Sequence, residues 1–487
     1  TLLSGMLKVL LGEGLQDQDF CDQNVSGLAA LQAEVSGFDL ADVAARTGVE
    51  DALIIEAARL FASGPKGTAI TGTGPEMGAH PNLTQHLVSS LNIVCGRFYR
   101  AGDRLPNPGM LSPPSPKVAQ VADVAVAWGR GERCRVRPDL GELVTPGRLG
   151  PSREMPTAQL ADEILTPGEG QVKALFVIAG NPIMAWPDQE KALAAMKDLE
   201  LLVCIDPYIS ATAELADYVL APKLTLERED VTLLSDAWYE KPYSQYSRAV
   251  IESEHDVIEE WELYWAIADR MNLEINIGRS VIPNQPKPEK FDVLKAITNG
   301  SRVDLDWLRD NPGGHIFEDV VSEVQPGPEG SVSKLKLYPD GVEEEFAELR
   351  AEPGLNADFP HLLIGFRSKY VLNSFGHNLP ALKKKSGTTN PAHLHPADLA
   401  ALGIDDDDEV QIASAHGQIS AIVKADAKIK PGVIAMHHCW GLSPDKQGSV
   451  RENGANTNLL VSSETDTQRY TGMTRSSSIP VRIKKSA

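Results

Sequence analysis

The sequence holds few cysteines and none in a metal-binding arrangement. Its five cysteines lie far apart and no two of them form a C-x-x-C pair, so nothing in the chain resembles an iron–sulfur or zinc ligand set. Long apolar runs are absent too. The longest candidate, residues 2–11, is interrupted by Ser4, Gly5 and Lys8, and we expect it to form an amphipathic helix rather than a membrane span.

Positive charge is also scarce. Against 67 acidic residues there are 46 lysines and arginines, a net charge of −21, which argues against nucleic acid or an anionic membrane as the main partner. A phosphate-bearing cofactor stays compatible with this balance, because backbone amides and a few local cations suffice to bind it. With 487 residues and 42% hydrophobic content, the chain is long enough for several cores.

The chain does not begin with methionine and opens directly in a predicted helix. We therefore expect a fragment whose amino-terminal part is missing. No signal region is present, so both a cytoplasmic and a periplasmic location stay open.

Residues 172–182 carry the clearest indication of chemistry. Residues 175–179 form a continuous apolar run of strand length, and Gly180-Asn181-Pro182 ends it with residues typical of a turn. Further apolar runs follow at 201–205 and 217–222. The residues between the run at 175–179 and the run at 201–205 have helical spacing. This alternation predicts an α/β fold with a doubly wound, mostly parallel sheet.

In such a sheet, ligands bind outside the carboxyl ends of the strands. Asn181, Asp206 and Asp217 stand at or near predicted strand ends. The amide of Asn181 can bind a polar ring edge, and Asp206 can accept hydrogen bonds from a ribose or a guanine amino group. The alternative is that Asn181 only makes a turn and Asp206 only caps one, and the residues alone favour this plainer interpretation.

The two ends of the chain differ in character. Residues 1–64 have helical patterns, and a short strand is predicted at 68–71 before the glycine turn Gly72-Thr73-Gly74, which either brings backbone close to a ligand or is a plain turn. Past residue 362 the pattern becomes β, with strands at 409–414, 418–425 and 433–438 that suit a small barrel or sandwich. In the last strand we expect His437 and His438 to face opposite sides and not to share a metal ion.

The ordered set of these motifs carries a family resemblance. Its members are Gly72-Thr73-Gly74, Leu91-Asn92, Gly96, Gly180-Asn181-Pro182, Asp206, Thr212-Ala213, 216–222, 398–404, Gly417, Pro431-Gly432 and 454–459. Together they resemble the molybdopterin guanine dinucleotide oxidoreductases, the family of dimethyl sulfoxide reductase, formate dehydrogenase and periplasmic nitrate reductase. The match runs over nearly the whole chain in the right order.

The resemblance implies two molybdopterin guanine dinucleotides that hold a molybdenum or tungsten ion, covered by a carboxy-terminal β-barrel of the double-psi type. The metal would pass two electrons between a small-molecule substrate and an iron–sulfur cluster or an electron-transfer partner. Composition and resemblance together predict four parts: 1–65, the remainder of a truncated α/β domain; 66–280, an α/β dinucleotide-binding domain; 281–357, a connector indicated by its prolines and weak periodicity; and 358–487, the barrel. The cofactor-binding residues carried over from the family are Gly72, Gly74, Gly180, Asn181, Asp206, Arg367, Asn378 and Asn458, with Asp217 a weaker candidate.

The chain also departs from the family. The cysteine-rich cluster domain and the region that supplies the metal's protein ligand are missing, so no catalytic residue and no metal ligand is nominated, and an iron–sulfur cluster is expected only in the missing region. The segment Gly472-Met473-Thr474-Arg475 lacks the proline and aromatic residue often found there. Two alternatives stay open: a non-redox hydratase or hydroxyl transferase of the same family, and a cofactor-free structural subunit of a respiratory complex.

Overall fold

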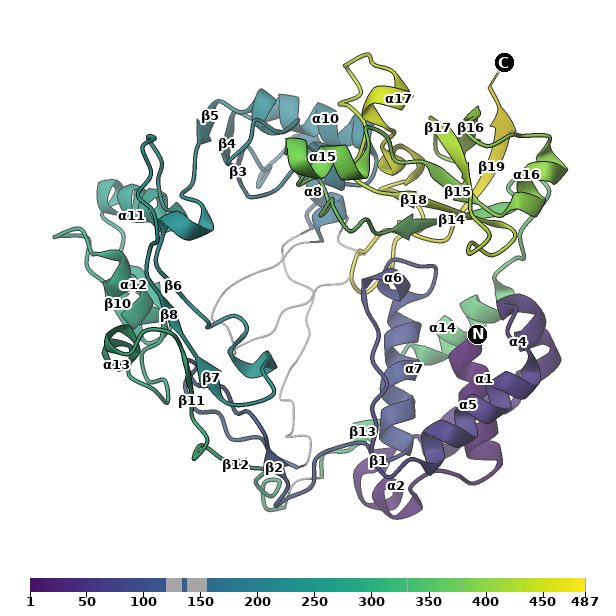
Figure 1. Cartoon of the computed structure of the whole chain (residues 1–487). Helices are drawn as coiled ribbons and strands as arrows, with labels where there is room; N and C mark the ends of the chain where they lie inside the picture. The colour runs from purple at the N-terminus through teal and green to yellow at the C-terminus, as the bar shows by residue number, and fades with distance from the viewer. Residues whose placement is uncertain (120–133, 138–155, 331, 378, 487) are drawn as a thin grey trace.

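The structure is a computed structural model that describes residues 1–119, 134–137, 156–330, 332–377 and 379–486. Its elements follow one another around a ring (Figure 1). The amino-terminal helices occupy one side, a parallel sheet and a barrel lie together at the top, and small helices and strands fill the opposite side.

The amino-terminal part is helical, as predicted, and has its own core. Leu7, Leu10 and Leu31 are fully buried in it, and Phe346 from α14 packs into the same cluster. Asp39 caps α4 through the amide of Ala41, and Gly48 ends that helix in the left-handed conformation. The elements are α1 (Leu2–Gly12), α2 (Gln18–Asn24), α3 (Leu28–Ser36), α4 (Leu40–Thr47), α5 (Asp51–Ser63), α6 (Thr73–Glu76), α7 (Pro81–Val94) and α14 (Val342–Ala351), with β1 (Val25–Ser26) parallel to β13 (Leu335–Lys336).

The strand predicted at 68–71 is wrong, because the chain there has no regular structure. The side chain of Asn92 in α7 accepts from the amide of Ala69 at 2.7 Å and donates to its carbonyl at 2.8 Å. Asn92 thus binds the backbone groups of Ala69 that a neighbouring strand would have paired.

The predicted parallel sheet is confirmed. Its order is β3-β4-β5, all parallel, with Val177 opposite Cys204 and Cys204 opposite Val219. Helices α8, α9 and α10 pack on the face that carries these three residues. The elements are η1 (Thr157–Gln159), α8 (Leu160–Leu165), β3 (Ala174–Ile178), α9 (Pro182–Ala185), α10 (Gln189–Asp198), β4 (Leu201–Ile205), η2 (Ala213–Leu215) and β5 (Tyr218–Leu220).

The middle of the chain forms short paired strands and helices around a small core that includes Met110, Tyr246 and Leu308. Residues 281–357 are folded rather than a plain linker, since they contribute α12, α13, β11, β12, β13 and α14; the four-part division stays a prediction. The elements are β2 (Arg104–Leu105), η3 (Thr225–Glu227), β6 (Asp230–Val231), η4 (Asp236–Trp238), β7 (Tyr243–Ser244), β8 (Tyr246–Ser247), α11 (Glu260–Met271), β9 (Ile275–Ile277), β10 (Ser280–Ile282), α12 (Lys290–Ile297), α13 (Leu305–Asp310), β11 (His315–Ile316) and β12 (Ser322–Glu323).

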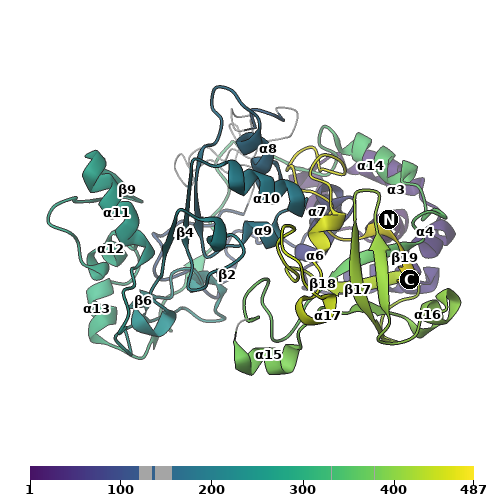
Figure 2. The same ribbon diagram turned by 90° about the horizontal axis from the view of Figure 1, so that it is seen from above.

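The carboxy-terminal part is a closed barrel with strand order β14-β18-β15-β17-β16-β19. The three strands predicted here each end within one residue of their expected bounds. Figure 2 shows the sheet and the barrel next to each other, with α9 and α10 on the side that faces the barrel. The elements are β14 (His361–Phe366), α15 (Pro380–Ser386), β15 (Ala392–Leu394), α16 (Pro396–Leu402), β16 (Glu409–Ala413), β17 (Gln418–Ala425), β18 (Val433–His437), α17 (Val450–Asn453), η5 (Thr457–Leu460) and β19 (Ile479–Lys485).

No helix within the described residues combines the length and the apolar character that crossing a membrane requires.

Candidate cofactor site

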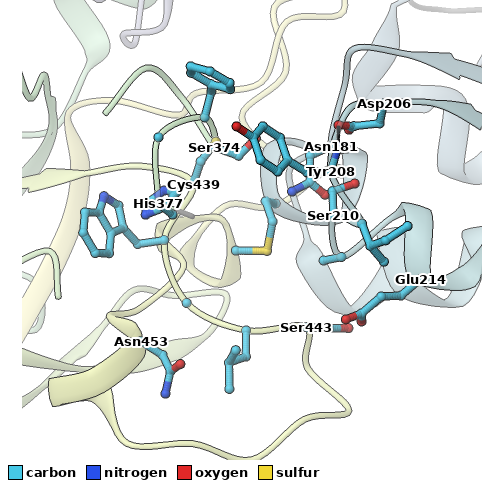
Figure 3. A pocket seen from close by; sticks show the side chains of 18 of the residues that line it. Asn181, Asp206, Tyr208, Ser210, Glu214, Ser374, His377, Cys439, Ser443 and Asn453 are labelled. Carbon is cyan, nitrogen blue, oxygen red and sulfur yellow. Dashed lines mark hydrogen bonds between the residues drawn. The ribbon is translucent and has the colours of Figure 1, made fainter. Parts of the chain in front are cut away.

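A cavity of about 510 Å³ lies between the carboxyl ends of the sheet strands and the loops of the barrel (Figure 3). The sheet contributes residues 179–181 and 206–211 to its walls, and the barrel contributes 374–377 and 439–443. The cavity therefore stands where a parallel sheet binds ligands, and the barrel covers that position.

Asn181 on the sheet wall has a fixed side-chain orientation. It follows β3 and stands at the N-cap of α9, with Pro182 at the first helical position. The backbone amide of Ile183 donates to the hydroxyl oxygen of Thr212 at 3.1 Å, and that hydroxyl donates to Oδ1 of Asn181 at 2.9 Å. Since Oδ1 accepts this bond, Nδ2 of Asn181 stays available as a donor.

Asp206 supplies an acceptor on the same wall. It follows β4, and its Oδ1 accepts from the backbone amide of Tyr208 at 2.9 Å. Burial raises the pKa of Asp206 above its usual value, while the hydrogen bonds from Tyr208 and from the Ser210 hydroxyl oppose this rise. Asn181 and Asp206 thus place a donor and an acceptor at neighbouring strand ends.

The two walls share an uncommon backbone feature. Ala179 follows β3 with φ +49°, and Cys439 lies two residues past β18 with φ +60°, a region that non-glycine residues rarely adopt. Gly441 also has positive φ, and a Cβ there would lie 2.8 Å from the amide nitrogen of Asn456. These turns let backbone, rather than side chains, form part of the cavity wall.

Trp440 in the barrel wall contacts a pair of neighbouring histidines. Trp440 Nε1 donates to Nδ1 of His437 at 3.0 Å, and the rings of His437 and His438 stack with 5.4 Å between centroids. The expectation that these two histidines face opposite sides is therefore wrong, because β18 ends at His437 and the alternation of a strand stops there. Burial, together with His437 and Arg367, lowers the pKa of His438 to about 4. Across the described part of the chain, no group of three histidine, cysteine or acidic side chains has a geometry that could hold a metal ion.

The structure brings together three of the predicted cofactor residues, Gly180, Asn181 and Asp206, in this cavity. It separates Asp217 from them. Asp217 precedes β5 and accepts from the amide of Leu202 at 2.8 Å, so it lies at the amino end of the sheet.

The other predicted residues lie elsewhere. Asn458 is buried and donates to the carbonyl of Met184 at 3.0 Å, which ties the barrel to α9. Gly72 and Gly74 are exposed at the start of α6, with open space where a Cβ would stand. Arg367 is exposed beside His438 and donates to Asn373 at 2.9 Å. Asn378 lies outside the described residues.

Several cavity residues were not predicted. The rings of Tyr208 and Phe375 pair across the cavity at 5.8 Å, and Glu214 forms an ion pair with Lys446. Each pair joins the sheet to a barrel loop more than 150 residues away, so no local pattern signals it. The run Lys383 to Lys385 was visible in the sequence, and only Lys383 of the three lines the cavity.

Two family models match the chain. The model of the molybdopterin oxidoreductases matches residues 6–270, more than half of the chain, and that of the molydopterin dinucleotide binding domain matches residues 362–477. The chain belongs to the molybdopterin oxidoreductase family. The first match contains the sheet wall of the cavity, and the second contains the barrel wall.

Similar proteins span redox and non-redox activities. Acetylene hydratase of Syntrophotalea acetylenica is 23% identical over 92% of this chain and 63% of its own length. The alpha subunit of NADPH-Fe(3+) oxidoreductase of Geobacter sulfurreducens is 26% identical over 91% of this chain and 47% of its length. The alpha subunit of F420-dependent formate dehydrogenase 1 of Methanococcus maripaludis is 24% identical over 89% and 62%.

The chain thus spans about half to three fifths of the length of these curated relatives. Among solved structures, acetylene hydratase of Pelobacter acetylenicus superposes with a TM-score of 0.77 at 20% identity, covering 100% of this chain and 70% of that one. At this identity the likeness shows the fold.

Proposed function

We propose that the cavity between sheet and barrel binds the guanosine end of a molybdopterin guanine dinucleotide. The observation that carries the proposal is the position of Asn181 and Asp206. Both line the cavity at adjacent strand ends, opposite the barrel that matches a molydopterin dinucleotide binding domain. A guanine ring offers N1–H and 2-amino donors for a carboxylate and a carbonyl acceptor for an amide. The carboxylate of Asp206 and the amide of Asn181 therefore fit the guanine end of the cofactor.

The residues of the chain have separate tasks in this proposal. Asp206 accepts from the guanine donors, and Nδ2 of Asn181 donates to the base or ribose. Lys383 and Lys446 at the cavity wall offset phosphate charge in a chain that is acidic overall. The bound cofactor would supply a molybdenum or tungsten ion able to exchange two electrons with a small-molecule substrate.

A second dinucleotide is proposed at the start of α6, where Gly72 and Gly74 leave open backbone, and Arg367, which follows β14 in the barrel, would offer a forked donor. Asn378 also stays proposed as a cofactor residue from the barrel, while Asn458 becomes a weaker proposal and Asp217 stays one. For Asn458 and Asp217 the reason is that their side chains already bond within the protein. An iron–sulfur cluster and an electron-transfer partner belong to the proposed activity of the whole protein.

Guanine nucleotide binding tests the proposal directly. In calorimetry, we expect the 487-residue chain to bind GDP more tightly than ADP. Adenine lacks the 2-amino and N1–H groups from which Asp206 would accept hydrogen bonds. Asp206→Asn should lose about 1–3 kcal/mol of that binding, while Lys384→Glu, a residue outside the cavity lining, serves as the control. Equal affinity for GDP and ADP, or no effect of Asp206→Asn, would contradict the assignment.

A non-redox hydratase is the second candidate. It is favoured by the similarity to acetylene hydratase over 92% of the chain. Dye-linked reduction assays on the whole protein should separate the two: turnover of an electron-accepting dye supports the oxidoreductase, and hydration without dye reduction supports the hydratase. Metal analysis addresses the third alternative, because a whole protein without molybdenum, tungsten or pterin would indicate a structural subunit.

A further inference from the structure

One side of the cavity is closed by an irregular loop of the barrel, residues 441–448, here named the barrel strap. Gly441, Leu442, Ser443 and Lys446 of the strap line the cavity. The strap begins and ends at glycines. Both pack against barrel residues outside the strap: a Cβ at Gly441 would lie 2.8 Å from the amide nitrogen of Asn456, and one at Gly448 would lie 2.7 Å from Nδ2 of Asn453. Its two ends are therefore fixed to the barrel, and the residues between them bridge to the sheet.

Three contacts fasten the strap to the sheet side. Gln189, which is fully buried, donates to the carbonyl of Leu442 at 3.1 Å. Lys197 of α10 pairs with Asp445 at 2.6 Å, and Lys446 pairs with Glu214 of η2. One fastener is thus buried and two are ionic.

The two ion pairs are exposed. The side chains of Lys197 and Asp445 are 48% and 40% accessible, and those of Lys446 and Glu214 are 46% and 38%. Exposed pairs contribute little to stability and are screened by salt. They can therefore break without unfolding either domain.

We propose that the barrel strap is a latched gate of the nucleotide cavity, opened when the pairs Lys197–Asp445 and Glu214–Lys446 break. This inference rests on the proposed function. It adds that the rate of nucleotide release increases with ionic strength. The ligand class is a guanine nucleotide, free or as the end of the dinucleotide cofactor.

The pair Lys197–Asp445 gives the sharpest test, because neither residue lines the cavity and a change there cannot touch the ligand directly. Asp445→Lys and Lys197→Glu each place like charges together, and the double variant Lys197→Glu/Asp445→Lys restores an opposite pair. Lys384→Glu on α15 is the matched control for a charge change away from the strap.

Two measurements on the 487-residue chain keep the proposals apart. Without ligand, amide hydrogen exchange at 441–448 should become about two- to fivefold faster in each single variant and return towards the wild-type rate in the double variant. With a fluorescent GDP analogue, the release rate should follow the same order and rise with salt in the wild type. Unchanged amide exchange in the single variants would overturn the gate whether or not nucleotide binds. Faster strap exchange with no nucleotide bound in any variant would overturn the proposed function, and with it the strap's role as a nucleotide gate.

Discussion

The hydroxyl of Thr212 donates to Oδ1 of Asn181 at 2.9 Å, while it accepts from the backbone amide of Ile183 at 3.1 Å. Thr212 is fully buried, so no solvent competes for its single proton. The backbone amide of Thr212, which can only donate, also lies 3.3 Å from Oδ1 of Asn181, and this fixes that atom as the oxygen of the side-chain amide. The orientation of the Asn181 amide therefore follows from the fold, and its Nδ2 is held ready as a donor before any ligand arrives.

Asn181→Asp tests this arrangement. The carboxylate keeps an oxygen for Thr212 but loses the amide donor and brings negative charge towards the phosphates. We expect GDP binding to weaken by about 1–3 kcal/mol, or roughly five- to 150-fold, in calorimetry. The thermal midpoint should change little, because the Thr212 bond persists. Wild-type affinity in this variant would show that the Asn181 amide does not contact the nucleotide.

Much of the fold could be predicted because its signals are local. Continuous apolar runs closed by turn residues marked β3 and β4, and glycine and proline turns marked the barrel strands. One misplaced element had a distant cause: the side chain of Asn92 binds the backbone of Ala69 where a strand was expected at 68–71. The position of Asp217 is local, because the strand predicted at 217–222 begins with it and its amino end therefore carries that side chain. More than half of the residues that line the cavity come from the barrel part, which only tertiary packing brings to the sheet.

Gly454 should be a sensitive position in the barrel. It has φ +73°, and a Cβ there would overlap Oδ1 of Asn390 and lie 3.1 Å from the Trp440 side chain. Asn390 is buried and bonds the carbonyl of His437 at 2.6 Å and the amide of Ala455 at 2.8 Å. Gly454→Ala should therefore destabilise the protein by about 2–4 kcal/mol, since it adds a clash to the backbone strain.

Gly403→Ala is the matched control for that substitution. Gly403 also has positive φ, +65°, but no atom lies within 4 Å of the point that a Cβ would occupy. It should cost only about 1 kcal/mol, the backbone contribution alone. Chemical denaturation followed by tryptophan fluorescence gives both values, and equal losses in the two variants would contradict the role assigned to Asn390.

The stability of the barrel should depend on pH through His438. Burial, His437 and Arg367 lower the pKa of His438 to about 4 in the folded protein, below its ordinary value of 6.5. Between pH 4 and pH 6.5, His438 is therefore protonated in the unfolded chain and neutral in the folded protein. The contribution of His438 to stability is complete above pH 6.5 and is lost as the pH falls towards 4. Burial lowers the pKa of His437 and His377 as well, so they act in the same direction.

Comparison of the wild type with His438→Gln isolates this contribution from the carboxylates that also titrate at low pH. We expect the denaturation midpoint of the wild type to fall more steeply between pH 6.5 and 4 than that of the variant. Glutamine keeps a donor for Oδ1 of Asn373, which lies 3.0 Å from Nε2 of His438. Parallel pH profiles would contradict the assignment.

Asp236 should be the most sensitive acid in the middle of the chain. It is buried, with only 2% of its surface exposed, and its Oδ2 accepts from the backbone amides of Met110 and Leu111, the latter at 2.7 Å. The carbonyl of Asp236 also accepts from Asn107 at 2.8 Å. Asp236→Ala would leave two amides without their acceptor in the core that holds Met110 and Leu111, at a cost of about 3 kcal/mol or more. Glu240→Gln, an exposed acid four residues on, should leave the denaturation midpoint unchanged. If both variants unfold at the wild-type midpoint, the amides of Met110 and Leu111 do not depend on Asp236; if only Asp236→Ala shifts, the carboxylate anchors segment 107–111 to the middle of the chain.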